Sequence, residues 1–301
     1  MDGLLRYVDP VHGPILGVDS SPQPGILRPA YWFSRAKLAV LERFSERLAR
    51  PLAGAGWSPD KETSQRKAVT EGIERWAHAT TRPRAAGLDR DPTTNGFAAL
   101  PLAFPNADAH ARRLALDEAV ERWAMTRLSG TSPLPLQRFP PGKAVLALWR
   151  SPRNLELFGA SIASETDGVT QLRIAIGRFA SGGIVLGAAC ACDPAAAEEK
   201  AWIEAFNGRR KFLRVIDGNE QLLPRISLQR LWHYATDPRA AGRLRARLAE
   251  RTQAGAATAV APSVILSARI AGPWESDFVV WRCLVDDAPP PTEGGLDRWI
   301  F

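Results

Sequence analysis

A seven-residue phrase that occurs twice constrains this chain more than any other feature. Residues 71–77 read Glu-Gly-Ile-Glu-Arg-Trp-Ala, and residues 118–124 read Glu-Ala-Val-Glu-Arg-Trp-Ala. Positions three apart lie on one face of an α-helix, so each copy projects two carboxylates to the same side. The apolar residues around the copies follow helical spacing, which predicts long helices over residues 63–80 and 106–128.

Four carboxylates brought together would repel one another unless cations lay between them. Magnesium that carries nucleotide phosphates is the commonest arrangement of this kind. A solvated helix face with Glu–Arg pairs is the simpler explanation of a single copy. Two copies that share both their charges and their aromatic neighbour favour a common function.

The rest of the chain alternates helix and strand patterns. Asp193 and Pro194 fit the cap and the first position of a third helix, which includes residues 197–207. A basic amphipathic helix is expected over residues 237–252. The expected strands cover residues 144–149, 172–176, 184–188, 263–270 and 278–285. Because these elements follow no strict βαβ repeat, the pattern favours an α+β fold over a doubly wound parallel sheet.

The N-terminal third is harder to interpret from its pattern. Residues 1–30 look extended or looped, because five prolines interrupt them. Residues 35–50 follow helical spacing. Residues 54–59 and the pair Asn95-Gly96 are typical of turns.

Charge and cysteine content narrow the class of protein. The chain of 301 residues has a net charge of +7. This charge is spread along the chain, which favours a GC-rich genome as its source over a nucleic-acid or membrane partner. Neither a signal peptide nor a convincing membrane span is expected. Three cysteines without metal spacing indicate reduced, mostly buried thiols of a cytoplasmic protein.

Three motifs resemble the signatures of YcaO-domain proteins, in the order that this family shows. The first motif covers residues 54–75, which read Gly-Ala-Gly and later Ala-x-x-Glu-x-x-Glu-Arg. The second motif covers residues 95–122, which begin Asn-Gly-Phe-Ala-Ala and end Glu-x-x-Glu-Arg. The third motif covers residues 193–207, with Asp-Pro and Lys-Ala-x-x-Glu-x-x-Asn. The strand Phe-Val-Val-Trp-Arg at residues 278–282 also resembles a late family strand. The resemblance spans roughly residues 50–285.

This resemblance implies a YcaO-like fold, a mixed sheet with packed helices around a glutamate-lined site for ATP and Mg²⁺. The implied metal ligands are Glu71, Glu74, Glu118, Glu121 and Glu204. The implied nucleotide-binding residues are Glu71, Glu74, Asn106, Glu118, Arg122, Lys200 and Glu204. The implied catalytic residues are Glu118, Glu121, Arg122, Lys200 and Glu204. Such a donor set suits phosphoryl transfer, which needs mainly positioning and neutralisation of charge.

The resemblance also implies an activity and partners. It implies an ATP-dependent cyclodehydratase that converts Cys, Ser or Thr of a ribosomally synthesised precursor peptide to azolines. Thioamide formation, amidine formation and a non-catalytic scaffold subunit are the alternatives. The implied partners are the precursor peptide, a leader-peptide-recognition protein of E1-like or winged-helix type, and a flavin dehydrogenase. A homodimer is also compatible with the family.

The sequence departs from the family pattern at several positions. These are Ala55, Lys67, Trp123, Lys200 and Asn207. The expected organisation is an N-terminal segment over residues 1–50 that could dock a partner, an ATP-binding catalytic domain over residues 51–285, and a Pro-rich tail over residues 286–301.

Overall fold

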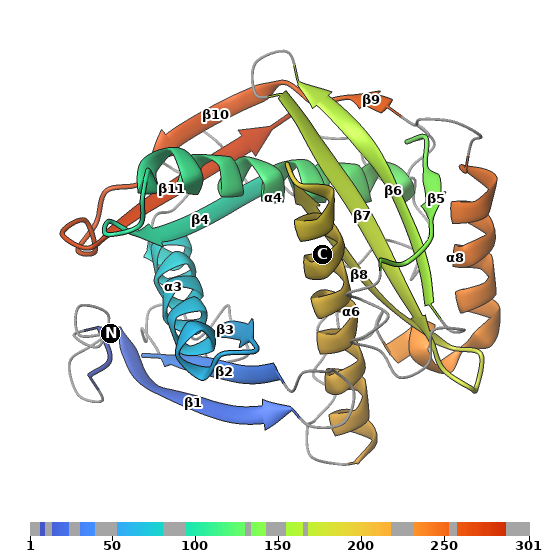
Figure 1. Cartoon of the computed structure of the whole chain (residues 1–301), viewed down its shortest axis with the longest axis horizontal. Helices are drawn as coiled ribbons and strands as arrows, with labels where there is room; N and C mark the ends of the chain where they lie inside the picture. The colour runs from blue at the N-terminus through green and yellow to red at the C-terminus, as the bar shows by residue number, and fades with distance from the viewer. Residues whose placement is uncertain are drawn as a thin grey trace. The chain divides into compact units, whose positions relative to one another are not determined.

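The computed structural model contains two compact units built from antiparallel strands and long helices. It describes residues 7–9, 14–23, 31–39, 53–80, 94–129, 134–142, 155–164, 168–217, 232–252 and 258–286. The first unit comprises Met1–Leu116, Leu148–Arg150 and Ile265–Leu284. The second comprises Asp117–Ala147, Ser151–Val264 and Val285–Phe301. Both units combine sheets and helices in an order that confirms the predicted α+β class (Figure 1).

A three-stranded antiparallel sheet and one helix form the N-terminal part of the first unit. The strands follow the order β1 (Ile15–Gln23), β2 (Tyr31–Leu38) and β3 (Ala53–Ser58). Helix α3 (Lys61–Thr80) packs against this sheet. Its apolar residues, with Ile73 fully buried, form one hydrophobic core with residues of β1, β2 and the later strands of this unit.

A second three-stranded sheet completes the first unit. Its order is β10 (Val264–Arg269), β11 (Phe278–Val285) and β4 (Asn95–Pro101), and β11 runs antiparallel to β4. Helix α4 (Ala107–Ser129) starts in this unit, where its first turns pack against Val279. Its residues from Asp117 onward belong to the second unit.

The second unit is built on a five-stranded sheet. Its strands are β5 (Gln137–Phe139), β6 (Leu155–Ser164), β7 (Gly168–Arg178), β8 (Ile184–Ala191) and β9 (Thr258–Val260). The first four are antiparallel neighbours in this order, and β9 pairs in parallel with β6. Helix α6 (Pro194–Ile216) packs on β7 and β8, and helix α8 (Pro238–Glu250) belongs to the same unit.

Most of the predicted elements are confirmed. The helix patterns correspond to α3, α4, α6 and α8, and four of the five strand patterns correspond to β7, β8, β10 and β11. The fifth, over residues 144–149, lies outside the described residues. The predicted thiols are also confirmed: Cys190 and Cys283 are buried, Cys192 is exposed, and none forms a disulfide. None of the helices in the described part of the chain has the length and apolarity that crossing a bilayer requires.

Three local predictions are wrong. Residues 54–58 form strand β3 instead of a turn, because their glycines allow close packing against a helix. Asn95-Gly96 begins β4 instead of forming a turn. Residues 35–38 belong to β2 instead of a helix, since alternate residues are buried with a period of two. Residues 40–50 of that predicted helix lie outside the described residues.

The cap of α6 gives a first testable prediction. Asp193 accepts hydrogen bonds from the backbone N–H groups of Ala195, at 3.2 Å, and Ala196, at 3.1 Å. Asp193→Ala is expected to lower the free energy of unfolding by about 1 kcal/mol, because these donors lose their acceptor. Urea denaturation measures the change. Asp193→Ser, which keeps an acceptor, is the control; equal losses in both variants would contradict the capping role.

Candidate functional site

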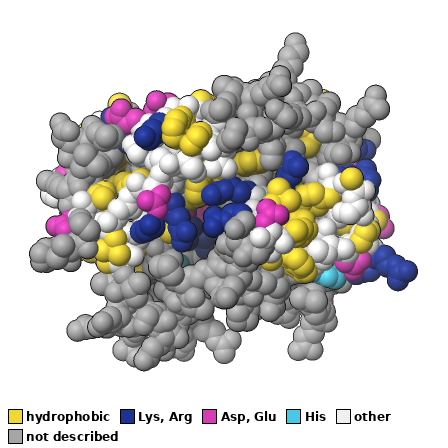
Figure 2. All heavy atoms as spheres, turned by 90° about the horizontal axis from the view of Figure 1, so that it is seen from below, with side chains coloured by type: hydrophobic (Ala, Val, Ile, Leu, Met, Phe, Trp, Pro, Cys, Tyr) yellow, Lys and Arg dark blue, Asp and Glu magenta, His cyan; other side chains and the backbone are white. Residues whose placement is uncertain are grey.

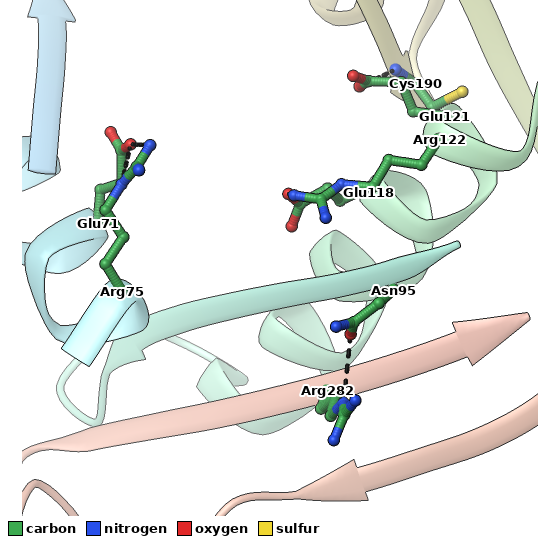
Figure 3. A network of polar contacts seen from close by, with 8 residues as sticks. All are labelled: Glu71, Arg75, Asn95, Glu118, Glu121, Arg122, Cys190 and Arg282. Atoms are coloured by element: carbon green, nitrogen blue, oxygen red, sulfur yellow. Dashed lines mark hydrogen bonds and ion pairs between the residues drawn. The ribbon is translucent and has the colours of Figure 1, made fainter. Parts of the chain in front are cut away.

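The second copy of the repeated phrase forms the centre of a carboxylate cluster in the second unit. Helix α4 carries Glu118, Glu121 and Arg122 within two turns. Glu118 forms an ion pair with Arg122, and about a third of each side chain is exposed. Glu121 accepts a hydrogen bond of 3.3 Å from the backbone N–H of Cys190 on β8. Figure 3 shows these two separate contacts, with Glu118 beside Arg122 and Glu121 beside Cys190.

The surroundings of Glu121 keep its carboxyl group protonated at neutral pH. Burial raises its pKa to about 8, and the nearby carboxylates of Glu118 and Glu204 add to the rise. The N–H of Cys190 and the guanidinium of Arg122 oppose it only in part. A divalent cation bound beside Glu121 would favour its ionised form and lower this pKa.

Helix α6 supplies Glu204 to this cluster. Lys200 and Glu204 lie one turn apart on α6, and both are exposed. The helix packs tightly on β8: a Cβ atom at Gly187 would lie 2.2 Å from the carbonyl oxygen of Ala201. The same Cβ would lie 2.9 Å from the carbonyl carbon of Glu204, so the strand glycine fixes the turn that carries this carboxylate.

The first copy of the phrase lies in the first unit, on α3. One carboxylate oxygen of Glu71 pairs with Arg75, whose Nε lies 2.8 Å away. The other accepts a hydrogen bond of 2.7 Å from the backbone N–H of Ala55 on β3. Glu74 is partly buried. The first glutamate of each copy therefore pairs with the Arg four residues later. Such pairs are what a solvated helix face, the simpler explanation of a single copy, predicts.

Asn106 immediately precedes α4 and has a positive φ of 52°. Its carbonyl oxygen accepts a hydrogen bond of 3.0 Å from the N–H of His110, which closes the first turn of the helix. Asparagine tolerates this left-handed conformation better than most residues. A role of its side chain in nucleotide binding stays a prediction.

The structure thus brings Glu118, Glu121, Arg122 and Glu204 together, and it carries Glu71 and Glu74 in the other unit. Within the described ranges, no three Asp, Glu, His or Cys side chains are grouped so that they could hold one metal ion. The complete predicted ligand set therefore stays a prediction.

Two buried arginines were not predicted as site residues. Arg173 on β7 is 6% exposed, and its guanidinium lies 4.2 Å from the ring centre of Phe139. Burial lowers its pKa, whereas the carboxylate of Glu198 on α6 favours its charged form. In the first unit, Nε of the buried Arg282 donates a hydrogen bond of 3.2 Å to Asn95 (Figure 3). The sequence signal that could have identified both residues is an arginine inside an apolar strand pattern, since a charged side chain is buried there only when it has partners.

Figure 2 shows how the basic side chains are distributed on one face of the described residues. On the face drawn in Figure 2, Lys and Arg side chains occur in several groups, separated by hydrophobic and acidic ones. This distribution agrees with the spread of charge along the sequence.

The raised pKa of Glu121 predicts how stability depends on pH. The folded protein holds this proton up to about pH 8, whereas an unfolded glutamate loses it near 4.5. Between these values the folded state binds more protons, so the free energy of unfolding is expected to fall as the pH rises. Urea denaturation across this range, with metal chelated, measures the slope. Glu121→Gln should reduce the fall, and Glu62→Gln, at an exposed ion pair, should not. An unchanged slope in Glu121→Gln would contradict the raised pKa.

Comparison with known proteins identifies the fold. No family model matches the chain, and no curated protein matches it in sequence. Among solved structures, YcaO from Methanopyrus kandleri, bound with AMPPCP and Mg²⁺, aligns with a TM-score of 0.54 at 14% identity, over 94% of this chain and 87% of that one. The E. coli microcin synthetase McbBCD complex with pro-MccB17 bound aligns with a TM-score of 0.53 at 12% identity, over 89% and 87%. The same complex determined separately gives 0.54 at 11% identity, with the same coverage. These similarities show that the chain has a YcaO-like fold.

Proposed function

We propose that this protein is an ATP- and Mg²⁺-dependent enzyme that activates backbone amides of a ribosomally synthesised precursor peptide. The observation that carries the proposal is the YcaO-like fold, in which Glu118 and Glu204 lie near enough to the buried Glu121 to help raise its pKa. Binding of a divalent cation would ionise the Glu121 carboxyl group, whose pKa is raised to about 8 in the protein without metal. A similar fold binds AMPPCP and Mg²⁺ in the Methanopyrus protein.

The residues of the cluster fit magnesium and a nucleotide in their chemistry. Glu118, Glu121 and Glu204 offer the hard oxygen ligands that Mg²⁺ prefers, and Glu71 and Glu74 offer the same type of ligand in the first unit. Arg122 and Lys200 offer cations for phosphate oxygens, and Asn106 a polar contact. Bound Mg–ATP would supply the phosphoryl group that converts an amide-derived oxygen into a leaving group. The protein's part is to hold the nucleotide, orient the peptide amide and neutralise developing charge.

The proposed reaction is cyclodehydration of Cys, Ser or Thr residues to azolines. In this reaction the side chain attacks the preceding amide carbonyl, and the oxygen leaves as phosphate. Sulfide as the nucleophile would give a thioamide, and an amine would give an amidine.

The McbBCD complex binds pro-MccB17, which supports a precursor peptide and partner proteins for this chain. A leader-recognition protein and a flavin dehydrogenase are the partners that we propose, in the cytoplasm where ATP is available.

Two measurements test this function. Titration calorimetry of the full chain with AMPPCP, with and without Mg²⁺, should show Mg²⁺-dependent binding. Mass spectrometry of the precursor peptide, incubated with the chain, its partner protein and Mg–ATP, should show loss of water for an azoline or exchange of oxygen for sulfur for a thioamide. A folded chain that binds no nucleotide and leaves the peptide unchanged would overturn the proposal.

A non-catalytic scaffold subunit is the second candidate. It is favoured by the ion pairs of Glu71 with Arg75 and Glu118 with Arg122, which occupy one carboxylate of each copy. A scaffold would bind its partner protein and increase that partner's activity without binding nucleotide. Nucleotide binding therefore distinguishes the two candidates directly.

A further inference from the structure

A cavity of about 580 Å³ in the second unit has no part in the proposed function. It lies between helix α8 and the strands β5 and β6, which are neighbours in Figure 1. Its lining residues are Arg138, Glu156, Phe158, Gly242, Arg245, Ala246, Ala249 and Thr252. None of them belongs to the carboxylate cluster. The volume falls within the range of about 300–1,000 Å³ that is usual for small-molecule sites.

The charges in this cavity do not cancel. Glu156 is buried, and its Oε1 accepts a hydrogen bond of 2.8 Å from Nε of Arg245, with Arg178 3.9 Å away. Arg245 therefore neutralises the only acidic side chain of the lining. Arg138 on β5 is exposed and makes no hydrogen bond or ion pair within the described part of the chain. An exposed guanidinium at the edge of a cavity, with no such partner among the described residues, favours an anionic ligand.

Apart from Thr252, the remaining lining is apolar. Ala246 and Ala249 lie on one exposed face of α8, while Leu244 and Leu248 bury the opposite face. The two alanines line the cavity together with Phe158 of β6, which is otherwise buried. A preformed apolar surface beside an arginine suits a ligand that has both a hydrophobic body and a negative charge.

We propose that this cavity is a second ligand site, which binds a small organic anion. The carboxylate of the ligand pairs with Arg138, and its hydrophobic body lies against Phe158, Ala246 and Ala249. Arg245 stays committed to Glu156 and forms the polar wall of the site. This site does not depend on nucleotide binding, so its test is independent of the proposed function.

Ligand-observed NMR titrations of the full chain test the site with benzoate, with neutral benzamide and with inorganic phosphate. We expect benzoate to bind at least about tenfold more tightly than either of the others, because only benzoate has both the charge and the ring. Arg138→Gln should weaken benzoate binding at least about tenfold, since it removes the partner of the carboxylate. Ala246→Trp should also abolish binding by filling the cavity.

Arg243→Gln is the matched control, because Arg243 is an exposed arginine of α8 outside the lining. It changes the net charge as Arg138→Gln does and should leave benzoate binding unchanged. Circular dichroism checks that each variant is folded. Absence of benzoate binding to the wild-type chain, equal binding of benzamide or phosphate, or equal losses in Arg138→Gln and Arg243→Gln would each overturn the proposal.

Discussion

Replacing both Glu118 and Glu121 with Gln is expected to abolish ATP-dependent peptide modification, with a rate at least about 10³-fold below that of the wild type. Glutamine keeps the shape of the side chain but removes the negative charge that a Mg²⁺ ion requires. Glu121 is already protonated in the metal-free protein at neutral pH, so its replacement removes little that stabilises the fold. The double variant should therefore stay folded and lose nucleotide affinity.

Phosphate release in the presence of peptide and partner protein measures turnover, and calorimetry with AMPPCP and Mg²⁺ measures affinity. Glu62→Gln is the control, since Glu62 forms an exposed ion pair with Arg66 on α3 and lies outside the cluster. It should retain the activity of the wild type. A folded double variant with turnover within about tenfold of the wild type would contradict the assignment of this cluster as the metal site.

Much of the fold could be predicted because its longest elements have strong periodic patterns. Helices α3, α4, α6 and α8 each show helical spacing of apolar residues, and α6 also has its capping aspartate and proline. The glycine-containing strand β3 could not be predicted in the same way. Its two glycines, Gly54 and Gly56, have the local sequence signature of a turn. They are explained by the close approach of helix α3, which a short sequence pattern cannot show.

For the candidate site, the sequence could predict the identities of the donor residues but not their contacts with other elements. The repeated phrase identified Glu118, Glu121 and Arg122, and the resemblance added Glu204. The sequence could not show that Glu121 lies against the backbone of Cys190, because this contact joins residues 69 positions apart. Nor could it show that Arg173 and Arg282 are buried, since burial of an arginine depends on partners from other elements.

The two copies of the phrase are less equivalent in the structure than in the sequence. In its packing against a strand glycine, helix α3 resembles α6 more closely than it resembles α4, which carries the second copy. On α3, the motif Ala68-x-x-Glu71 packs against Gly54 of β3, where an added Cβ would lie 2.1 Å from the carbonyl oxygen of Ala68. On α6, the motif Ala201-x-x-Glu204 packs against Gly187 of β8. In both cases a strand glycine positions a helical glutamate.

Gly187→Ala is therefore expected to affect stability and function together. The new Cβ would lie 2.2 Å from the carbonyl oxygen of Ala201 and 2.3 Å from the backbone nitrogen of Ala205. Both contacts are with backbone atoms, so α6 must move away from β8. The expected loss in the free energy of unfolding is about 3 kcal/mol, which urea denaturation measures. The displacement would also move Glu204 and weaken the binding of AMPPCP with Mg²⁺, which calorimetry measures on the folded fraction.

Gly242→Ala is the control for this prediction, because it adds the same methyl group in the same unit where a Cβ would meet no atom within 4 Å. Gly242 lies inside helix α8, so its replacement should raise the free energy of unfolding by about 1 kcal/mol or less and leave nucleotide affinity unchanged. The opposite signs of the two changes separate the effect of close helix packing from that of removing a glycine. Wild-type stability in Gly187→Ala would show that α6 does not need this close approach, and unchanged affinity in a destabilised variant would show that nucleotide binding does not depend on the position of Glu204.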